Sequence, residues 1–134
     1  MFFDGGDTFH GTLPVVISRG EALIPILSEL GFSAMVGHWD FTYKPEHLLA
    51  LDKLLNYPVL SVNAYKDDGT LLRKPYSFIE IGGQKIAVID IYANIIDKTM
   101  PVKLFCKKGY VAFVMIKYKY LMNTKDKLLI YKMI

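Results

Sequence analysis

The sequence predicts an α/β fold in which a parallel or mixed sheet is flanked by helices. Short apolar runs alternate with segments of helical periodicity, in the order strand, helix, strand, helix, strand. Two further runs, at residues 76–81 and 85–91, are joined by a Gly-Gly pair that is typical of a hairpin. Polar loops at residues 4–12 and 37–43 follow the first two strands. Because the carboxyl ends of parallel strands meet at one edge of a sheet, we expect a functional site there.

The first helix is expected over residues 15–30, between a strand ending at Phe3 and a strand at residues 32–36. Its apolar residues recur at roughly helical spacing. Ser18 and a glutamate three residues later resemble a capping box, and Gly31 follows the last apolar residue as a C′ glycine. The pattern therefore predicts one continuous helix.

The second helix is expected over Pro45–Leu55, because proline favours the first turn and five leucines form an apolar side. A third strand is predicted at residues 58–62, and a turn at residues 66–69. Residues 93–100 are interpreted as a loop or a helical turn. No internal repeat is found.

Length and composition exclude several classes of protein. A chain of 134 residues suits one domain, and 52% hydrophobic residues exclude intrinsic disorder. The single cysteine, Cys106, excludes an intramolecular disulfide and a cysteine-built zinc site. No apolar run approaches the roughly 18–20 residues that span a bilayer. We also expect no signal peptide, since the first residues lack its basic and apolar regions, and the localisation stays open.

Charge is distributed unevenly along the chain. Residues 1–101 contain 8 Lys and Arg against 12 Asp and Glu, whereas residues 102–134 contain 8 Lys and a single acid, Asp126. The run at residues 117–120 interleaves lysine with tyrosine, a pattern that can bind single-stranded nucleic acid. Since no nucleic-acid-binding motif accompanies it, we expect no nucleic-acid partner. We divide the chain into a domain at 1–101 and a basic Lys/Tyr/Ile-rich tail at 102–134.

Two residues of the first loop are candidates for chemistry. Asp7 follows a Gly-Gly pair at a strand end, and a carboxylate exposed in this way is a good metal ligand. The alternative is a turn aspartate that bonds its own backbone. His10 is a candidate for acid–base or phosphate-binding work, or is a polar loop histidine without a special role.

The second loop adds His38, which is expected to approach Asp7 across the sheet edge. An imidazole and a carboxylate together suit Mn, Fe or Zn; a surface histidine is the alternative. Asp40 is expected either to orient His38 as a hydrogen-bond acceptor or to cap the next turn. Trp39 is expected to line a substrate pocket or to pack. Asn63, after the third strand, is expected to reach a metal or to form a turn.

The two loops together resemble a known family. The sequence Asp-Gly-Gly-Asp-Thr-Phe-His-Gly-Thr at residues 4–12, followed by Gly-His-Trp-Asp-Phe-Thr-Tyr at residues 37–43, is similar to the bacterial 5′-nucleotidases. These belong to the calcineurin-like metallophosphoesterases. The resemblance covers roughly residues 1–101. It implies a metal-dependent hydrolase acting on a nucleotide or another small phosphate ester.

The resemblance also implies roles for individual residues. Asp7 matches the aspartate that bridges two divalent metal ions, which together activate a water for in-line attack. His38 stands at the position of a metal-binding asparagine. Trp39 stands at the position of a histidine that assists the leaving group, although indole is a poor proton donor or acceptor. The His-Trp-Asp pattern looks like the subgroup that includes thiosulfohydrolases, whose substrate is a sulfur ester. Lys44 replaces the glycine usual after Phe-Thr-Tyr.

Other blocks of the family pattern are absent from the sequence. An Asp-x-His block is expected before residue 4, and a Gly-x-His-x-His block is expected later, but no histidine follows His47. We therefore expect a partial metallophosphoesterase sandwich that is truncated at both ends, with doubtful metal occupancy. The tail is hypothesised to be a frameshifted or read-through end, which family-like codons in another reading frame would support. Two functions stay open: a hydrolase fragment, or a non-catalytic remnant or interaction module. The oligomeric state is open.

Overall fold

The computed structural model of the chain describes residues 1–66, 68–92, 110–113 and 128–130. At its centre lie three short parallel strands, β1 (Phe3–Asp4), β2 (Ala34–Val36) and β3 (Val59–Leu60), which neighbour one another in that order. Helical connections join successive strands, as parallel pairing requires. The predicted α/β class, with a parallel sheet and flanking helices, is confirmed.

The predicted single helix over residues 15–30 is wrong. The segment instead forms α1 (Leu13–Ile17), the 3₁₀ turn η1 (Glu21–Leu23) and α2 (Ile24–Glu29). The break falls at Arg19 and Gly20, whose φ angles are 53° and 95°. A Cβ on Gly20 would lie 2.9 Å from the side chains of Phe9 and Leu51, so only glycine lets the chain turn here against the core.

The second predicted helix is confirmed with a shorter end. α3 spans Pro45–Asp52, with its proline in the first turn, rather than continuing to residue 55. The 3₁₀ turn η2 (Trp39–Tyr43) connects β2 to it. Ser18, predicted as an N-cap, ends α1 as its C-cap, although its hydroxyl also accepts a hydrogen bond from the Ala22 amide at 3.2 Å.

The predicted hairpin is confirmed. Strands β5 (Tyr76–Ile81) and β6 (Gln84–Ile89) pair antiparallel, and both glycines of their connection have positive φ. The sequence did not predict β4 (Ala64–Lys66), which pairs antiparallel with β7 (Tyr110–Phe113), nor β8 (Leu128–Ile130), which runs parallel to β6. The prediction for residues 93–100 lies outside the described residues.

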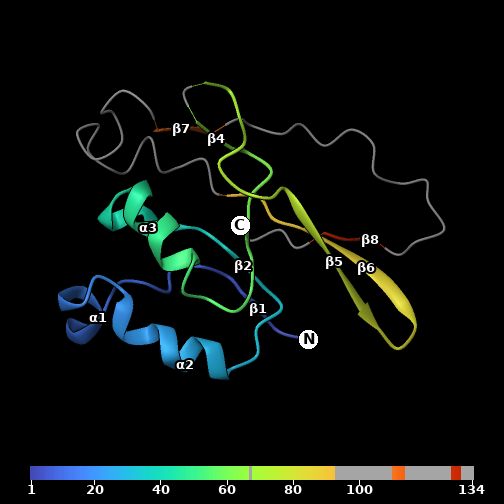
Figure 1. Cartoon of the computed structure of the whole chain (residues 1–134), viewed down its shortest axis with the longest axis horizontal. Helices are drawn as coiled ribbons and strands as arrows, with labels where there is room; N and C mark the ends of the chain where they lie inside the picture. Colours follow the sequence, from blue (N-terminus) through green and yellow to red (C-terminus); the bar gives the residue numbers. More distant parts are fainter. Residues whose placement is uncertain (67, 93–109, 114–127, 131–134) are drawn as a thin grey trace.

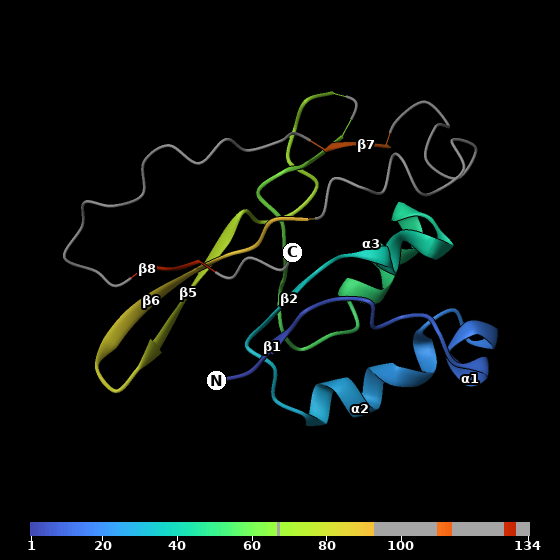
Figure 2. The same ribbon diagram turned by 180° about the vertical axis from the view of Figure 1, so that it is seen from behind.

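The two faces of the parallel sheet pack against different elements. Met35 of β2 is fully buried in a cluster that includes Leu48 and Leu51 of α3. Its neighbour Ala34 points to the other face, where it packs with Leu60 and with Val88 of β6. Figures 1 and 2 show the helices on one side of β1 and β2 and the hairpin on the other. Across the described segments, no helix has the length and apolarity needed to cross a membrane.

Candidate functional site

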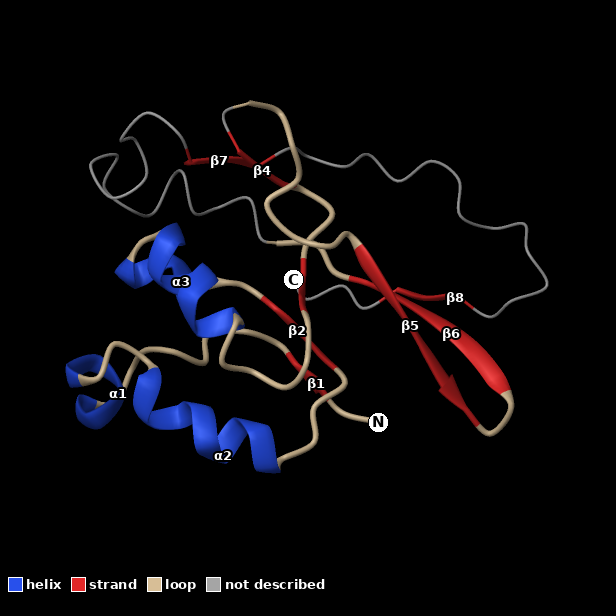
Figure 3. Cartoon of the chain, viewed as in Figure 1, coloured by secondary structure: helices blue, strands red, loops and turns tan. Residues whose placement is uncertain are grey.

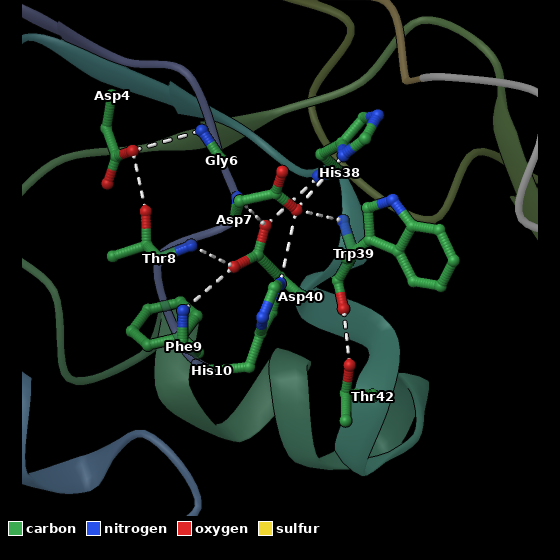
Figure 4. A network of polar contacts seen from close by, with 10 residues as sticks. All are labelled: Asp4, Gly6, Asp7, Thr8, Phe9, His10, His38, Trp39, Asp40 and Thr42. Atoms are coloured by element: carbon green, nitrogen blue, oxygen red, sulfur yellow. Dashed lines mark hydrogen bonds and ion pairs between the residues drawn. The ribbon is translucent and has the colours of Figure 1, made fainter. Parts of the chain in front are cut away.

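The loops that follow β1 and β2 touch at the carboxyl edge of the parallel sheet, as the strand order predicts (Figure 4). Gly6 makes the contact possible. It has φ +82°, and a Cβ at this position would lie 2.7 Å from the carbonyl oxygen of Val36 and 2.9 Å from the amide nitrogen of His38. Glycine is therefore required here both for the backbone conformation and for the space.

The carboxylate of Asp7 is the centre of the site. One of its oxygens, Oδ1, accepts a hydrogen bond from the Trp39 amide at 3.0 Å. The same oxygen lies 3.0 Å from Nδ1 of His38 and 3.2 Å from Nε2 of His10. The structure thus brings two other predicted site residues, His10 and His38, to one oxygen atom of Asp7. The Asp7 side chain is 49% exposed, so the cluster is open to a ligand.

The surroundings of Asp7 favour its charged form. Partial burial raises its pKa, but hydrogen bonds from His38, from the Trp39 amide and from His10 outweigh that effect and hold the pKa below its usual range. Asp7 also has a left-handed backbone, with φ 60°, which aspartate tolerates better than most residues. Near neutral pH the site therefore presents a carboxylate, the form that binds a cation.

Asp40 acts differently from the expectation that it orients the His38 ring. It is 1% exposed, and its Oδ1 accepts hydrogen bonds from the amides of Thr8 and Phe9 at 2.8 and 3.0 Å. Its Oδ2 accepts from the amides of Asp7 and His38, both at 3.0 Å. The contact with His38 is therefore through the main chain, and Asp40 fastens the first loop to the second.

Asp4 holds the first loop through two hydrogen bonds, a role that sequence reasoning missed. Its Oδ1 accepts from the Gly6 amide at 3.0 Å and from the Thr8 hydroxyl at 2.7 Å. Burial raises the pKa of Asp4 above its usual value, against the lowering effect of these hydrogen bonds. The spacing of an aspartate two residues before a glycine, as in an Asx turn, is the signal that could have found it.

The remaining two predicted site residues are Trp39 and Asn63. The ring of Trp39 is edge-on to His38, with centroids 6.3 Å apart, and is partly exposed beside the cluster. Its role in lining a pocket stays a prediction. Asn63 is 1% exposed, and its amide group bonds the main chain of Tyr92 and the hydroxyl of Ser61. None of its hydrogen bonds goes to Asp7 or His38, so the structure gives no support for Asn63 as a metal ligand.

A carboxylate oxygen with two imidazole nitrogens is a donor set of the kind that Mn, Fe and Zn take. Within the residues that the structure describes, however, no group of three or more His, Cys, Asp or Glu side chains is arranged to hold a metal ion. The donors present fit such an ion in type, and Asp7 with His38 would contribute to its coordination. They do not complete it among the described residues.

Known proteins are similar to this chain in sequence and in fold, although no family model matches it. The chain is 32% identical over 104 residues to an NAD 5′-nucleotidase of Haemophilus influenzae, covering 75% of this chain and 17% of that protein. It is 31% identical over 98 residues to a snake venom 5′-nucleotidase of Gloydius brevicauda, covering 66% and 16%. The chain thus spans about a sixth of the length of the curated relatives it matches.

Solved structures give the same result. A sulfate thiohydrolase, SoxB, of Thermus thermophilus superposes with a TM-score of 0.74 at 26% identity, over 84% of this chain and 21% of that one. A 5′-nucleotidase precursor of the same organism superposes with a TM-score of 0.70 at 26% identity, over 86% and 22%. The order of strands and helices agrees with these structures, and in sequence and fold the chain is similar to 5′-nucleotidases.

Proposed function

We propose that this chain is part of a metal-dependent hydrolase that cleaves a small phosphate ester, with a nucleotide as the first substrate class to test. The observation that carries the proposal is the convergence of His10 and His38 on one oxygen of Asp7. This cluster lies at the carboxyl edge of a parallel sheet, where α/β enzymes place their sites. The relatives named as nucleotidases support the substrate class.

Each residue has a defined part in this proposal. Asp7 and His38 would each give one donor atom to a divalent ion, which when bound would acidify a water and offset negative charge on the ester. Asp40 keeps both donors in place by holding the main chain on either side. His10 lies 3.2 Å from Asp7 and therefore beside the proposed metal position. From there it would donate a proton or a hydrogen bond to an anionic substrate bound at the metal.

The donors of the described residues form only part of a coordination sphere. Zinc sites use about four ligands, and catalytic sites keep about three from protein. We therefore propose that further donors come from outside the described residues. A non-catalytic function is the alternative from the sequence.

A sulfur ester is a second candidate substrate. The specific observation in its favour is the TM-score of 0.74 with the sulfate thiohydrolase, together with a tryptophan beside His38. An indole ring cannot exchange a proton in the relevant pH range. A thiolate needs less assistance than an alkoxide on leaving, because the pKa of a thiol is lower. An S-sulfonated thiol is therefore the substrate to compare with a nucleotide.

The test is metal content and turnover of the purified chain with Mn²⁺, using a nucleoside monophosphate and an S-sulfonated thiol in parallel. Asp7→Asn is expected to abolish both metal binding and hydrolysis. Asp68→Asn is the matched control, because Asp68 is an exposed loop aspartate that bonds only Thr70 among the described residues. A folded chain that neither binds metal nor turns over either substrate would overturn the proposal, as would full activity in Asp7→Asn.

A further inference from the structure

We propose that Tyr92 and Arg73 are positioning residues for the His38 segment, which we define as residues 37–41. Neither residue is recognisable as a site residue from the sequence, and both lie in the interior of the fold. The inference rests on the proposed function, because it concerns the residues that hold that site in shape. Tyr92 contacts the segment at both of its ends, Gly37 and Phe41.

The first contact is at Gly37, immediately before His38. The position of a Cβ on Gly37 would lie 2.6 Å from Cζ of Tyr92 and 2.8 Å from its hydroxyl oxygen. These distances leave no room for a methyl group, and the phenol therefore lies directly against the main chain of Gly37. Because Tyr92 is fully buried, its ring cannot swing out to solvent to relieve a displacement.

The second contact is at Phe41, the last residue of the segment. Its ring packs edge-on against that of Tyr92, with centroids 5.4 Å apart. Both rings are fully buried. Tyr92 thus supports the segment where it leaves β2 and again where η2 has turned. Between these two points lie His38, Trp39 and Asp40, which carry the polar contacts of the site.

Tyr92 is itself held by Asn63 and Arg73. Its amide donates to Oδ1 of Asn63 at 2.8 Å, and its carbonyl accepts from Nδ2 of Asn63 at 2.8 Å. Its hydroxyl accepts a hydrogen bond from Nη1 of Arg73. The Arg73 guanidinium also lies over the rings of Phe41 and Tyr92, 5.9 and 5.7 Å from their centroids. The side-chain amide of Asn63 therefore sets the main chain of Tyr92, and Arg73 sets the hydroxyl.

Arg73 in turn is anchored to α3. Its Nε donates to Oδ2 of Asp52 at 2.6 Å, and its Nη2 forms an ion pair with the same oxygen at 2.5 Å. The Arg73 side chain is only 3% exposed. Burying a charged pair is costly compared with packing apolar side chains of the same volume. The Arg73 guanidinium instead fixes the orientation of the groups it contacts, because its planar fork holds several partners in one geometry.

These contacts form one connected path from α3 to the site: Asp52, Arg73, Tyr92, Gly37 and His38. Asn63 is joined to this path through its two hydrogen bonds with the main chain of Tyr92. It also predicts that the Tyr92 hydroxyl, not only the ring, is needed to keep His38 beside Asp7. Removing the hydroxyl oxygen of Tyr92 should therefore move the His38 side chain.

The test is NMR of the ¹⁵N-labelled chain without added metal, comparing wild type with Tyr92→Phe. We expect shifts and broadening of the His38 ring signals and of the amides of residues 37–41, while the ring signals of His47, on α3, stay unchanged. Val88→Ala is the matched control, since it creates a cavity in the separate cluster of Ala34 and Leu60. Should Tyr92→Phe not fold, Asp52→Asn combined with Arg73→Met removes the same anchor without leaving a buried charge.

Signals of His38 and of residues 37–41 that move no more in Tyr92→Phe than in Val88→Ala would overturn the inference. Larger movement in Tyr92→Phe, with a comparable melting temperature in the two variants, supports it. The result is separate from the proposed function because the spectra require neither metal nor substrate. A chain without hydrolase activity would fail the proposed function and leave this inference standing. Unchanged His38 signals would overturn this inference and leave the proposed function standing.

Discussion

Asp7 and Asp40 each hold the loop that carries the other. The amide of Asp7 donates to Oδ2 of Asp40 at 3.0 Å, while the amide of Trp39, the residue before Asp40, donates to Oδ1 of Asp7 at 3.0 Å. The two carboxylates differ in exposure, because Asp40 is buried and Asp7 is half exposed. The carboxylate of Asp40 therefore holds the two loops together, and the carboxylate of Asp7 remains open to a ligand.

Asp40→Ala should lower the free energy of unfolding by about 3 kcal/mol or more, because four main-chain amides lose their acceptor in a mostly buried setting. Urea unfolding followed by circular dichroism measures this. Asp68→Ala, in an exposed turn, is the control and should cost less than about 1 kcal/mol. Equal effects of the two substitutions would show that the Asp40 carboxylate does not hold the loops.

Gly6→Ala should destabilise the chain more than Gly11→Ala. Both glycines have positive φ, 82° and 103°, so both substitutions introduce backbone strain. Only at Gly6 would the new methyl group meet other atoms, since nothing lies within 4 Å of a Cβ at Gly11. The difference in melting temperature between the variants isolates the contact of the two loops. Similar melting temperatures would contradict the close approach of Gly6 to Val36.

Lys44→Gly should stabilise the chain by about 1 kcal/mol. Lys44 has φ 82° and ψ 154°, a conformation that is essentially confined to glycine and costs about 1–3 kcal/mol for other residues. The greater freedom of glycine in the unfolded chain offsets part of the gain. Lys53→Gly is the control, because Lys53 has an ordinary helical φ of −71° and should become less stable. Thermal unfolding of both variants measures these changes. A loss of stability in Lys44→Gly would show that the Lys44 backbone is not strained.

Asp90 should make the chain less stable as the pH rises from about 4 to 6. Burial raises the pKa of Asp90 from 3.8 to about 6, so the folded chain retains a proton that the unfolded chain has released. Stability is therefore greatest below pH 3.8 as far as this group is concerned, and it falls through pH 6 by about 2–3 kcal/mol. Asp90→Asn should flatten this part of the curve of unfolding free energy against pH. An unchanged slope would show that the carboxyl is hydrated.

The sequence by itself was sufficient to predict the alternation of strands and helices, the hairpin at Gly82-Gly83 and the meeting of Asp7 with His38. These features follow from local periodicity, from turn residues and from the rule that parallel strands share a carboxyl edge. The family resemblance also came from the two loops that carry Asp7 and His38, at residues 4–12 and 37–43. Neither the complete metal coordination nor the reaction follows from them.

Only the tertiary structure decided the break at Gly20, the four amides on Asp40 and the support of His38 by Tyr92 and Arg73. Each of these depends on contacts between residues far apart in the chain, which no local pattern encodes. Helical periodicity continues through residues 15–30, yet the approach of Phe9 and Leu51 to Gly20 forces a turn. The sequence predicts Asp40 to accept from His38 or to cap a turn, and it gives Arg73 no role. Packing makes Asp40 an acceptor for main-chain amides and Arg73 a buried donor to Tyr92.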